Sequence, residues 1–375
     1  MALHLTYQPD LEIRQRLDSW DHAVRRYPEL DEGDWRLVAV WPAARGASIS
    51  GSTGIERNPL RQDEVEAVLA GAAVEGDREH VREVENYNRA LRLARDAVRR
   101  PDFTWTQQLI HDINATIMDG LADDTRGNYR RAVDEDVGVG SLYVAPAGPV
   151  VHALMGELVG WLNRSGRESP LVRSALAHLN VAAIHPFMNG NGRTARILAA
   201  MVLMEDGIRA PELISVEAYL RRHVEAYYAA LRTTIGPSYD PDNHPVSEWL
   251  AYYTQISLDR VEVRNRILDS TPSDFGVLYA ALADRGEPVT WAPALLAARV
   301  TRVRTTEFAA MTHRTLAPAR TELARLVASG WLVAHGQTRG RWYAPSDRLQ
   351  AIPLRVPLLM RRLTEGAELA EFPSG

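Results

Sequence analysis

The chain has 375 residues, of which 46% are hydrophobic and 24% charged, and its formal net charge is −5. This composition is typical of a globular protein and excludes one that is basic overall. The sequence has no cysteine, which excludes disulfides and thiolate metal sites. All 43 basic residues are arginine, so every basic side chain that contacts a phosphate must do so with a planar guanidinium.

The N-terminal residues lack the basic and apolar regions of a signal peptide. The longest fully apolar run, 197–204, is much shorter than the roughly 20 residues that cross a membrane. We therefore expect a cytoplasmic protein with no membrane partner. At about 100 to 200 residues per domain, the length favours two or three units.

Apolar residues at helical spacing predict helices along most of the first 270 residues. Residues 125–149 are instead rich in Gly and Pro with short β-branched runs, which predicts an irregular segment or a short hairpin. The expected fold class is therefore mainly α, a helical core with a short β-hairpin flap. The predicted helices cover 11–24, 64–100, 104–121, 151–162, 171–184, 194–205, 216–234 and 247–267.

Residues 185–196, HPFMNGNGRTAR, carry the clearest chemical signal. Pro186 disfavours the α conformation at His185, so the preceding helix must end there. The two glycines of 190–193 permit backbone angles that are closed to other residues, and the run after them is a strong helix former. Residues 190–193 are therefore expected at a helix N-terminus, where free N–H groups and the helix dipole favour an anion.

The residue types around this helix start suit phosphate chemistry. Arg193 and Arg196 are three residues apart on one helix face, and two guanidiniums over a nest of amides suit a di- or triphosphate. His185 is the one proton-transfer group in the loop. Its cationic neighbours and the helix N-terminus should lower its pKa and keep it neutral. It could then act as general base for a hydroxyl that attacks a phosphate.

The stretch resembles the signature of the Fic family: His-Pro-Phe, any residue, Asp or Glu, Gly-Asn-Gly-Arg, two residues and Arg. Enzymes of that family mostly transfer AMP from ATP to a Ser, Thr or Tyr hydroxyl of a target protein and release pyrophosphate. The resemblance covers roughly residues 45–265 and implies a Fic-type helical core with ATP as substrate. It implies His185 as general base, Phe187 as a buried anchor for the loop, Asn191 with the amides of Gly190 and Gly192 at the α- and β-phosphates, Arg193 at the β-phosphate and Arg196 at the γ-phosphate.

Two segments outside the signature support the resemblance. Residues 127–141 are similar to the family's flap, an extended segment that pairs with the backbone of the target and aligns its hydroxyl. The residues expected to dock the target are Val137, Gly138 and Val139. Tyr227 and Tyr228 match a helix that lines the nucleotide pocket, with a place in a helical core as an equal alternative. Self-modification and a homodimer are further possibilities that the resemblance leaves open.

Residues 48–60, SISGSTGIERNPL, resemble the inhibitory helix of Fic proteins, whose pattern is Ser or Thr, three residues, Glu, then Gly or Asn. Ser52 and Glu56 match this pattern, and Arg57 departs from it, which puts the helix geometry in doubt. In those proteins the glutamate pairs with the second arginine of the signature, here Arg196. A carboxylate there would occupy donors that the phosphate needs and would repel its charge. The other interpretation of Glu56 is a solvated loop residue.

Asn189 stands where the family signature has an acidic residue that binds Mg²⁺. A carboxamide oxygen can coordinate a hard cation, but without the formal charge that strengthens the bond. Asn189 could still hold Mg²⁺ or Mn²⁺ weakly, with the phosphates as the main ligands. Alternatively, Asp134, Glu135 or Asp136 of the flap replaces it. In the third interpretation metal-dependent transfer is lost, and the protein binds nucleotide or performs different chemistry.

The C-terminal part follows a different pattern. Residues 270–274, STPSD, have the composition of a short linker. A short helix at 306–311, a helix after Thr315 that Gly330 ends, and a hairpin with QTRG at its tip then predict a winged helix-turn-helix. This module resembles the winged helix domain that is often appended to Fic proteins.

From Arg285 to Arg341, nine arginines stand against three glutamates, which suits a DNA backbone. Winged helices also mediate protein contacts, so a dimerisation or substrate-docking module is the alternative. The residues expected to contact DNA are Arg314, Arg320, Arg339 and Arg341. The expected domains are an N-terminal helical region at 1–100 with an inhibitory helix near 48–58, a Fic catalytic core at 101–269, the winged helix-turn-helix at 270–348 and a C-terminal tail at 349–375.

These observations favour an autoinhibited protein adenylyltransferase. One alternative is a catalytically weak, nucleotide-sensing regulator that binds DNA through the C-terminal module. The other is a Fic-type transferase of a different phosphate-containing group.

Overall fold

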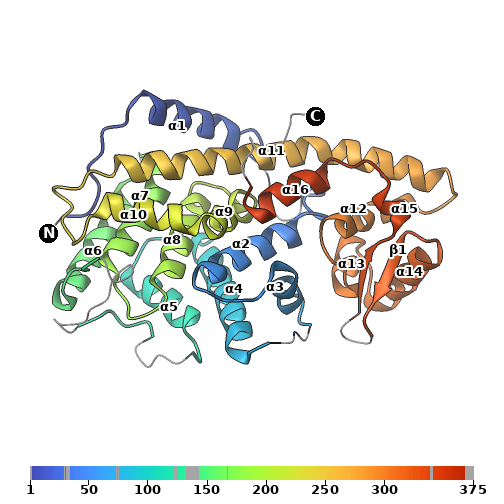
Figure 1. Ribbon diagram of the computed structural model, residues 1–375, viewed down its shortest axis with the longest axis horizontal. Helices are drawn as coiled ribbons and strands as arrows, with labels where there is room; N and C mark the ends of the chain where they lie inside the picture. Colours follow the sequence, from blue (N-terminus) through green and yellow to red (C-terminus); the bar gives the residue numbers. More distant parts are fainter. Residues whose placement is uncertain are drawn as a thin grey trace.

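The structure is a computed structural model that describes residues 2–28, 30, 34–72, 74, 76–121, 126–131, 143–166, 168–337 and 341–367. Within these residues the chain is mainly helical, as predicted, and its one sheet is a two-stranded ribbon. Helix α11, Ser247–Ala283, runs along most of the length of the molecule (Figure 1). Helix α1, Leu11–Val24, packs along its first half. No helix in the described part of the chain combines the length and the apolar character that crossing a membrane requires.

The helices between α2 and α11 form a bundle beneath the first half of α11 (Figure 1). Helices α7 and α8 pack along each other at its centre. Every residue of α7 from Leu171 to Ile184 is buried, so the position where this helix ends is fixed by packing on all sides. The bundle consists of α3 (Gln62–Leu69), α4 (Arg78–Val98), α5 (Gln107–Ile117), α6 (Gly148–Arg164), α7 (Pro170–Ile184), α8 (Asn191–Glu205), the 3-10 helix η1 (Pro211–Ile214), α9 (Glu217–Arg222) and α10 (Val224–Ile235).

Helix α2, Trp41–Ile55, lies between this bundle and the C-terminal helices (Figure 1). It is rich in Ala, Gly and Ser, and most of its residues are buried. Ala43 and Ala44 pack in the hydrophobic core of the C-terminal module, and Ile49 packs in the core of the bundle. Ile55 packs in a third core, between α7, α10 and α11. One helix therefore contributes to all three cores.

The C-terminal module lies beneath the second half of α11 (Figure 1). Its strands pair antiparallel, with Leu332 opposite Pro345 and His335 opposite Trp342. Val303 adds a bridge to Tyr343. The order of helices and hairpin is the one expected for a winged helix-turn-helix, an assignment that stays a prediction. The module comprises η2 (Val289–Trp291), α12 (Ala292–Val300), α13 (Thr305–Met311), α14 (Leu316–Ala328), β1 (Leu332–His335), β2 (Trp342–Pro345) and α15 (Asp347–Gln350).

Two of the predicted helices are each broken into two. The expected helix at 64–100 is α3 followed by α4, because Gly71 and Gly76 between them adopt φ values of 73° and 159° that end one helix before the next begins. The expected helix at 216–234 is α9 followed by α10, with a break at His223, whose φ of −112° and ψ of 42° are not helical.

The predicted linker at 270–274 is wrong, because these residues lie inside α11. A proline within a helix removes one backbone hydrogen bond and normally kinks or ends the helix. Helix α11 nevertheless continues past Pro272, since Phe275, Leu278 and Leu282 beyond it are buried in the core of the C-terminal module. Tertiary packing therefore overrides the local composition.

The segment expected as a C-terminal tail contains helix α16, Val356–Glu365. The two carboxylate oxygens of buried Asp274, on α11, accept from the backbone N–H groups of Arg355 and Val356 at 3.0 and 2.8 Å and so cap its first turn. Arg260 of α11 donates to the backbone oxygen of Arg362 near its other end. Helix α16 packs against α2 and α9, so the last described residues help to hold α2 in place.

Candidate functional site

The site begins where α7 ends. His185 follows the last helical residue and adopts the left-handed conformation, with φ 49° and ψ 59°. For a residue other than glycine this conformation costs about 1–2 kcal/mol, so contacts with the surrounding residues must stabilise it. Its ring nitrogen Nδ1 lies 3.4 Å from the backbone oxygen of Ala182. The helix thus stops at the residue that Pro186 predicts.

The loop after His185 is closed by its own residues. Phe187 is buried, as expected for an anchor, and its ring packs 5.2 Å from that of Tyr129. The side chain of Asn191 accepts from the backbone N–H of Phe187 at 2.8 Å and donates to its backbone oxygen at 2.7 Å. The side chain of Asn191 is therefore bound to the backbone of Phe187. Asn191 could contact an anion through its backbone N–H group.

Two glycines allow α8 to start against its neighbours. Gly190 precedes α8 with a φ of 78°, and a Cβ there would lie 3.0 Å from the Nδ2 atom of Asn114. A Cβ on Gly192 would lie 2.4 Å from Oε1 of Glu56. The first turn of α8 thus exposes backbone N–H groups directly beside the end of α2, and no other residue type would leave room for the Glu56 carboxylate.

Arg196 is held by the end of α2. It is 2% exposed, and its Nε donates to the hydroxyl of Ser52 at 2.7 Å. Its Nη2 donates to the backbone oxygen of Ser52 at 3.0 Å and to Oε1 of Glu56 at 2.8 Å. The structure therefore brings both residues predicted for inhibition onto the arginine predicted for the γ-phosphate.

Arg196 and Glu56 each favour the charged form of the other. Burial alone would lower the pKa of Arg196, but the negative charge and hydrogen bond of Glu56, together with the nearby Tyr227 and Tyr87, raise that pKa. Burial would likewise raise the pKa of the Glu56 carboxyl, but the charges of Arg196 and Arg193 hold it below its usual value. The side chain of Glu56 is 31% exposed, so the carboxylate also forms part of a pocket wall.

Arg193 faces different groups. Its Nη1 lies 3.4 Å from Oε1 of Glu83, and its Nη2 lies 3.5 Å from the sulfur of Met118. It is 6% exposed, and it is not one of the residues that line the large pocket described below. The two signature arginines are therefore close in sequence but differently placed.

Arg57, the residue that departs from the inhibitory pattern, has a φ of 70°. This is the left-handed region that glycine and asparagine adopt with least strain. The backbone thus has the shape that the pattern implies, although the residue type differs. Helix α2 ends at Ile55, so the inhibitory segment predicted near 48–58 comprises the last two turns of α2 and this left-handed turn.

A cavity of about 600 Å³ lies between the start of α8, the end of α2 and helix α10. Its volume is that of a site for a small molecule. Tyr228 is half-buried in its wall, whereas Tyr227 is buried and shares a hydrogen bond of 2.9 Å between its hydroxyl and Nε2 of His178. The sequence-predicted residues that line it are Glu56, His185, Asn189, Gly190, Asn191, Gly192, Arg196, Tyr227 and Tyr228.

The electrostatics of the pocket favour a neutral histidine. Burial lowers the pKa of His185 to about 4, and the positive charge of Arg130 acts in the same direction. The imidazole is therefore neutral at pH 7 and able to accept a proton, as the sequence predicts.

Asn189 is exposed at the edge of the pocket, and its backbone oxygen accepts from the side chain of Asn114 at 2.9 Å. Among the described residues, no three His, Cys, Asp or Glu side chains are grouped so that they could hold a metal ion. The flap acids Asp134, Glu135 and Asp136 lie outside the described residues. At the position where the family signature has its acidic metal ligand, this chain thus offers a neutral amide oxygen.

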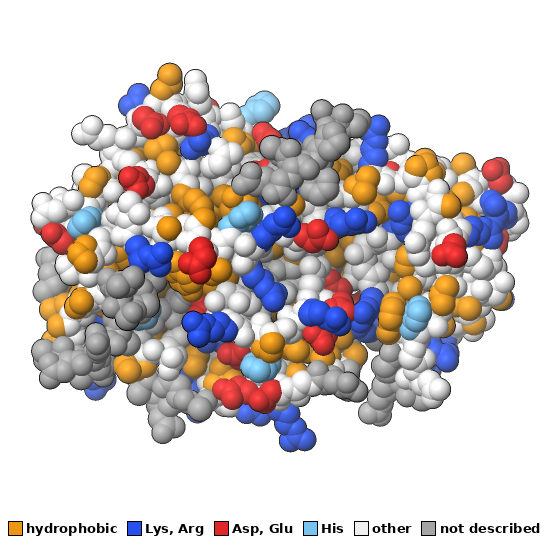
Figure 2. Space-filling model, viewed as in Figure 1, with side chains coloured by type: hydrophobic (Ala, Val, Ile, Leu, Met, Phe, Trp, Pro, Cys, Tyr) orange, Lys and Arg blue, Asp and Glu red, His pale blue; other side chains and the backbone are white. Residues whose placement is uncertain are grey.

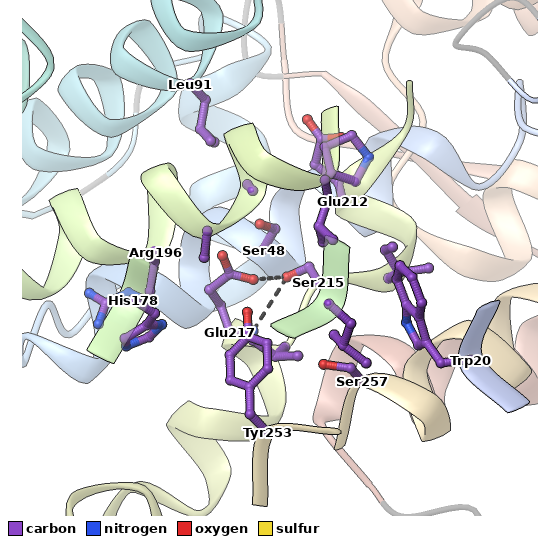
Figure 3. Close-up of a pocket in the computed structure, with 17 residues that line it drawn as sticks. Trp20, Ser48, Leu91, His178, Arg196, Glu212, Ser215, Glu217, Tyr253 and Ser257 are labelled. Atoms are coloured by element: carbon purple, nitrogen blue, oxygen red, sulfur yellow. Dashed lines mark hydrogen bonds between the residues drawn. The ribbon is translucent and has the colours of Figure 1, made fainter. Parts of the chain in front are cut away.

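A second cavity, of about 30 Å³, lies among α2, α7, α8, α9 and α11 (Figure 3). Its wall includes Ser48, His178, Arg196 and Glu217, and the volume suffices for a water molecule. Glu217 accepts a hydrogen bond from the Ser215 hydroxyl, and burial raises its pKa. This polar interior could not be predicted from the sequence, because its residues lie on separate helices and form no local pattern.

The remaining predicted residues lie away from the pocket or outside the described part. Val137, Gly138 and Val139 of the flap and Arg339 of the hairpin are outside it. Arg314, Arg320 and Arg341 are exposed on the C-terminal module, and Arg314 forms an ion pair of 3.4 Å with Glu322.

Most of the described arginines of 285–341 contact other groups of the same chain. Without Arg339, eight of the nine arginines are described, and five of them contact other groups of the chain. On the face in Figure 2, arginines are interspersed with acidic and hydrophobic side chains and do not form one continuous basic surface. The five engaged arginines are Arg285, Arg299, Arg302, Arg304 and Arg314.

Comparison with known proteins gives a family match over this part of the chain. Residues 104–203, which include His185 and the start of α8, match the Fic/DOC family. The chain contains a Fic domain. Its sequence is 29% identical over 257 residues to a protein adenylyltransferase Fic of Culex quinquefasciatus, an alignment that covers 65% of this chain and 46% of the relative. It is 32% identical over 126 residues to protein adenylyltransferase fic-1 of Caenorhabditis elegans, covering 32% of this chain and 23% of that one.

Solved structures share the fold of the Fic domain. A Fic family protein from Desulfovibrio desulfuricans aligns with a TM-score of 0.59 at 20% identity, over 91% of this chain and 99% of that one. Residues 134–508 of Fic-1 from C. elegans align with a TM-score of 0.57 at 22% identity, over 69% of this chain and 73% of that one. The chain spans less than half the length of the curated relatives it matches.

Proposed function

We propose that this protein transfers AMP from ATP to a Ser, Thr or Tyr hydroxyl of a target protein, and that Glu56 restrains the reaction. The observation that carries the proposal is the cavity in which a neutral His185, the amides at the start of α8 and the guanidinium of Arg196 meet. The names of the related protein adenylyltransferases support the same chemistry.

In the proposed reaction, the ring of His185 takes the proton of the target hydroxyl, whose oxygen attacks the α-phosphorus of ATP. The bond between the α-phosphorus and its bridging oxygen breaks, and pyrophosphate leaves. The N–H groups of Gly190, Asn191 and Gly192 and the guanidiniums of Arg193 and Arg196 would bind the phosphates and the charge that develops on them. A divalent ion held by Asn189 and the phosphates would add positive charge there.

The proposed restraint acts through Arg196. Its Nε and Nη2 atoms are occupied by Ser52 and Glu56, so two donors that a phosphate needs are already used. The carboxylate of Glu56 also stands in the cavity wall, where its charge repels a phosphate. Removal of the carboxylate is therefore expected to raise activity.

The deciding experiment incubates the purified chain with α-labelled ATP and Mg²⁺ or Mn²⁺. We expect Glu56→Gly to increase label on protein by about tenfold or more, which corresponds to about 1.4 kcal/mol. Glu56→Gln, which keeps the size but not the charge, should give an intermediate increase. His185→Ala in the Glu56→Gly protein should abolish the label. An unchanged or lower rate for Glu56→Gly would exclude the restraint, and label that persists in His185→Ala would exclude this base.

The same assay separates the alternatives. Nucleotide binding without label on protein would favour a nucleotide-sensing regulator, for which the neutral Asn189 at the usual acidic position is the favouring observation. Label transferred from the γ- and not the α-phosphate would favour a phosphotransferase. Label on the chain itself without a target would show self-modification. Binding of duplex DNA by the chain, lost in Arg320→Ala and Arg341→Ala, would assign the C-terminal module to DNA, whereas a dimer or target contact would assign it to protein.

The substitution Asn189→Asp tests whether the lack of a charged metal ligand at this position limits AMP transfer. If the wild-type site is impaired because it lacks a charged ligand, the aspartate should raise transfer by about tenfold or more and strengthen its dependence on Mg²⁺. Asn128→Asp, a second amide-to-acid change at an exposed position, provides the charge control. Equal rates for Asn189→Asp and wild type, each measured with Glu56→Gly, would show that the amide already suffices.

A further inference from the structure

We infer that Arg130 is a positioning residue for His185 and that it joins this histidine to both ends of the segment expected to dock a target. The inference rests on the proposed role of His185 as the base. Arg130 lies in the described part, 127–131, of the expected flap, but it is not among the residues predicted to contact the target or the nucleotide.

The guanidinium of Arg130 caps the end of α7. Its Nε donates to the backbone oxygen of His185 at 2.7 Å, and its Nη2 donates to that of Ile184 at 3.2 Å. The last carbonyls of a helix have no partner within the helix, and a charged donor pairs with them favourably. Arg130 is 3% exposed, so water hardly competes for these bonds.

Backbone contacts extend this cap to the next residue. The N–H of Arg130 donates to the backbone oxygen of Pro186 at 2.9 Å. Arg130 therefore holds the carbonyls of three successive residues, one before and one after the histidine. Because His185 is in a left-handed conformation that costs about 1–2 kcal/mol, contacts of this kind stabilise the backbone from which its ring projects.

The same side chain reaches the far end of residues 132–142. Its Nη2 also donates to the backbone oxygen of Pro146 at 2.9 Å. Tyr143, the first described residue after that segment, donates its hydroxyl to the backbone oxygen of Ala183 at 2.7 Å. The described residues on either side of 132–142 thus both contact the end of α7, next to the proposed base.

Arg130 does not line the nucleotide cavity, so it should influence the base without contacting ATP. The charged groups that act on His185 are Arg130, which lowers its pKa, and Glu56, which raises it, while burial has the largest effect. Loss of the Arg130 charge is therefore expected to raise the pKa of His185 from about 4.

The test uses the full chain with three substitutions, Arg130→Gln, Arg130→Lys and Arg131→Gln. Arg131 is the adjacent, exposed arginine, so its replacement removes the same charge without touching α7. The readouts are the titration of His185 by NMR on ¹⁵N-histidine-labelled protein, the affinity for a fluorescent ATP analogue, and the kcat for AMP transfer in the Glu56→Gly background.

For Arg130→Gln we expect nucleotide affinity within about threefold of wild type and a kcat about 100-fold lower, the size of effect that a misplaced catalytic group produces. The pKa of His185 should rise. Arg130→Lys keeps the charge but not the planar set of donors, so it should preserve the pKa and lose most of the kcat. Arg131→Gln should change neither the titration nor the affinity.

A folded Arg130→Gln protein with an unchanged His185 titration and an unchanged kcat would overturn the inference. So would a loss of affinity as large as the loss of kcat, which would indicate general damage to the pocket. If Arg130→Gln does not fold, Tyr143→Phe removes a single bond of the same cluster and should lower kcat without changing affinity. The titration of His185 and the nucleotide affinity can be measured in a protein that does not transfer AMP. An inactive Glu56→Gly protein would refute the proposed function, and these two measurements would still test the role of Arg130.

Discussion

At the scale of single residues, burial and charged partners together decide the charge that each side chain carries in the pocket. His185 is neutral because burial and Arg130 oppose its protonation, whereas Arg196 and Glu56 stay charged because each is the other's partner. A buried ion pair becomes costly when one partner is removed without a replacement. A bound phosphate would be such a replacement for Glu56, which is why exchange of the carboxylate for a nucleotide is physically reasonable.

The lowered pKa of His185 predicts the pH dependence of transfer. A group whose pKa is about 4 stays neutral as the pH falls from 8 to 6, so the kcat of the Glu56→Gly protein should be nearly constant over that range. A histidine with the usual pKa near 6.5 would lose about fourfold at pH 6. Initial rates at saturating ATP between pH 5.5 and 8 measure this, with circular dichroism to verify folding. A decline centred near pH 6.5 would contradict the burial of the ring.

Arg57 predicts a gain in stability. Replacement by glycine removes the cost of a side chain in the left-handed region, so Arg57→Gly should raise the free energy of unfolding by about 1 kcal/mol. The matched control is Arg92→Gly, an exposed arginine inside α4, which should lower it by about 1 kcal/mol. Both are measured by urea denaturation. Equal losses in the two variants would show that the Arg57 side chain contributes a contact that outweighs its backbone strain.

At the scale of elements, α2 is distinguished by how closely it approaches its neighbours. A Cβ on Gly51 would lie 2.5 Å from the backbone carbon of Glu217, and one on Gly54 would lie 2.3 Å from the guanidinium of Arg221. Arg221 in turn donates to the backbone oxygen of Ser50 at 3.0 Å. Small residues thus allow α9 to lie directly against the helix that carries Glu56.

This contact predicts opposite effects for two identical substitutions. Gly51→Ala places a methyl group on the α9 backbone and should lower the free energy of unfolding by about 3 kcal/mol. Gly276→Ala, inside α11 where nothing lies within 4 Å of the added Cβ, should raise it by about 0.5–1 kcal/mol through helix propensity. Thermal denaturation of both variants tests this. A neutral Gly51→Ala would show that α2 and α9 can separate at little cost.

Local sequence signals predicted the elements that local rules govern. The bounds of α1 were predicted to the residue, and the end of α7 followed from Pro186. The break between α9 and α10 was not predicted, because no Gly or Pro marks His223 and the change of direction depends on packing. The predicted linker failed for the converse reason, since burial of residues such as Phe275 keeps the helix intact through Pro272.

The candidate site likewise combines residues that local sequence patterns reveal with residues that only tertiary contacts reveal. The signature residues and Glu56 could be found because they form short patterns, and the structure brings them to one cavity. Arg130 and Glu217 could not be found, since their importance comes from contacts with backbone groups and helices distant in sequence. Such contacts leave no periodicity or motif in a single sequence.

At the scale of the whole molecule, the C-terminal segment is connected to the pocket through α2. Helix α16 is held on α11 at both ends, by Asp274 and by Arg260, and it packs against both α2 and α9. Asp63 of α3 also forms an ion pair with Arg302 of the C-terminal module. A change in the module can therefore reach Glu56 through packed helices.

Asp274 provides the test of this connection. Asp274→Ala removes both acceptors from the start of α16 and should lower the free energy of unfolding by about 1–2 kcal/mol. If α16 supports α2, hydrogen exchange at residues 41–56 should become faster while exchange in α5, on the far side of the bundle, should not change. The matched control is Asp269→Ala on the same helix, an exposed carboxylate that pairs with Arg26. Exchange in α2 that is equally slow in both variants would show that α16 is independent of it.

The packing of α2 also limits how the proposed restraint could be lost in evolution. Larger side chains at its buried positions would disturb the core that contains Ala43 and Ala44 or the contact of Gly51 with α9, so such changes would destabilise the fold together with the proposed restraint. Glu56 is different, because its side chain is partly exposed and fills no core. A single base change converts a glutamate codon to a glycine codon, so the shortest route to an unrestrained lineage passes through position 56. In a selection for higher activity, independent clones should converge on that position.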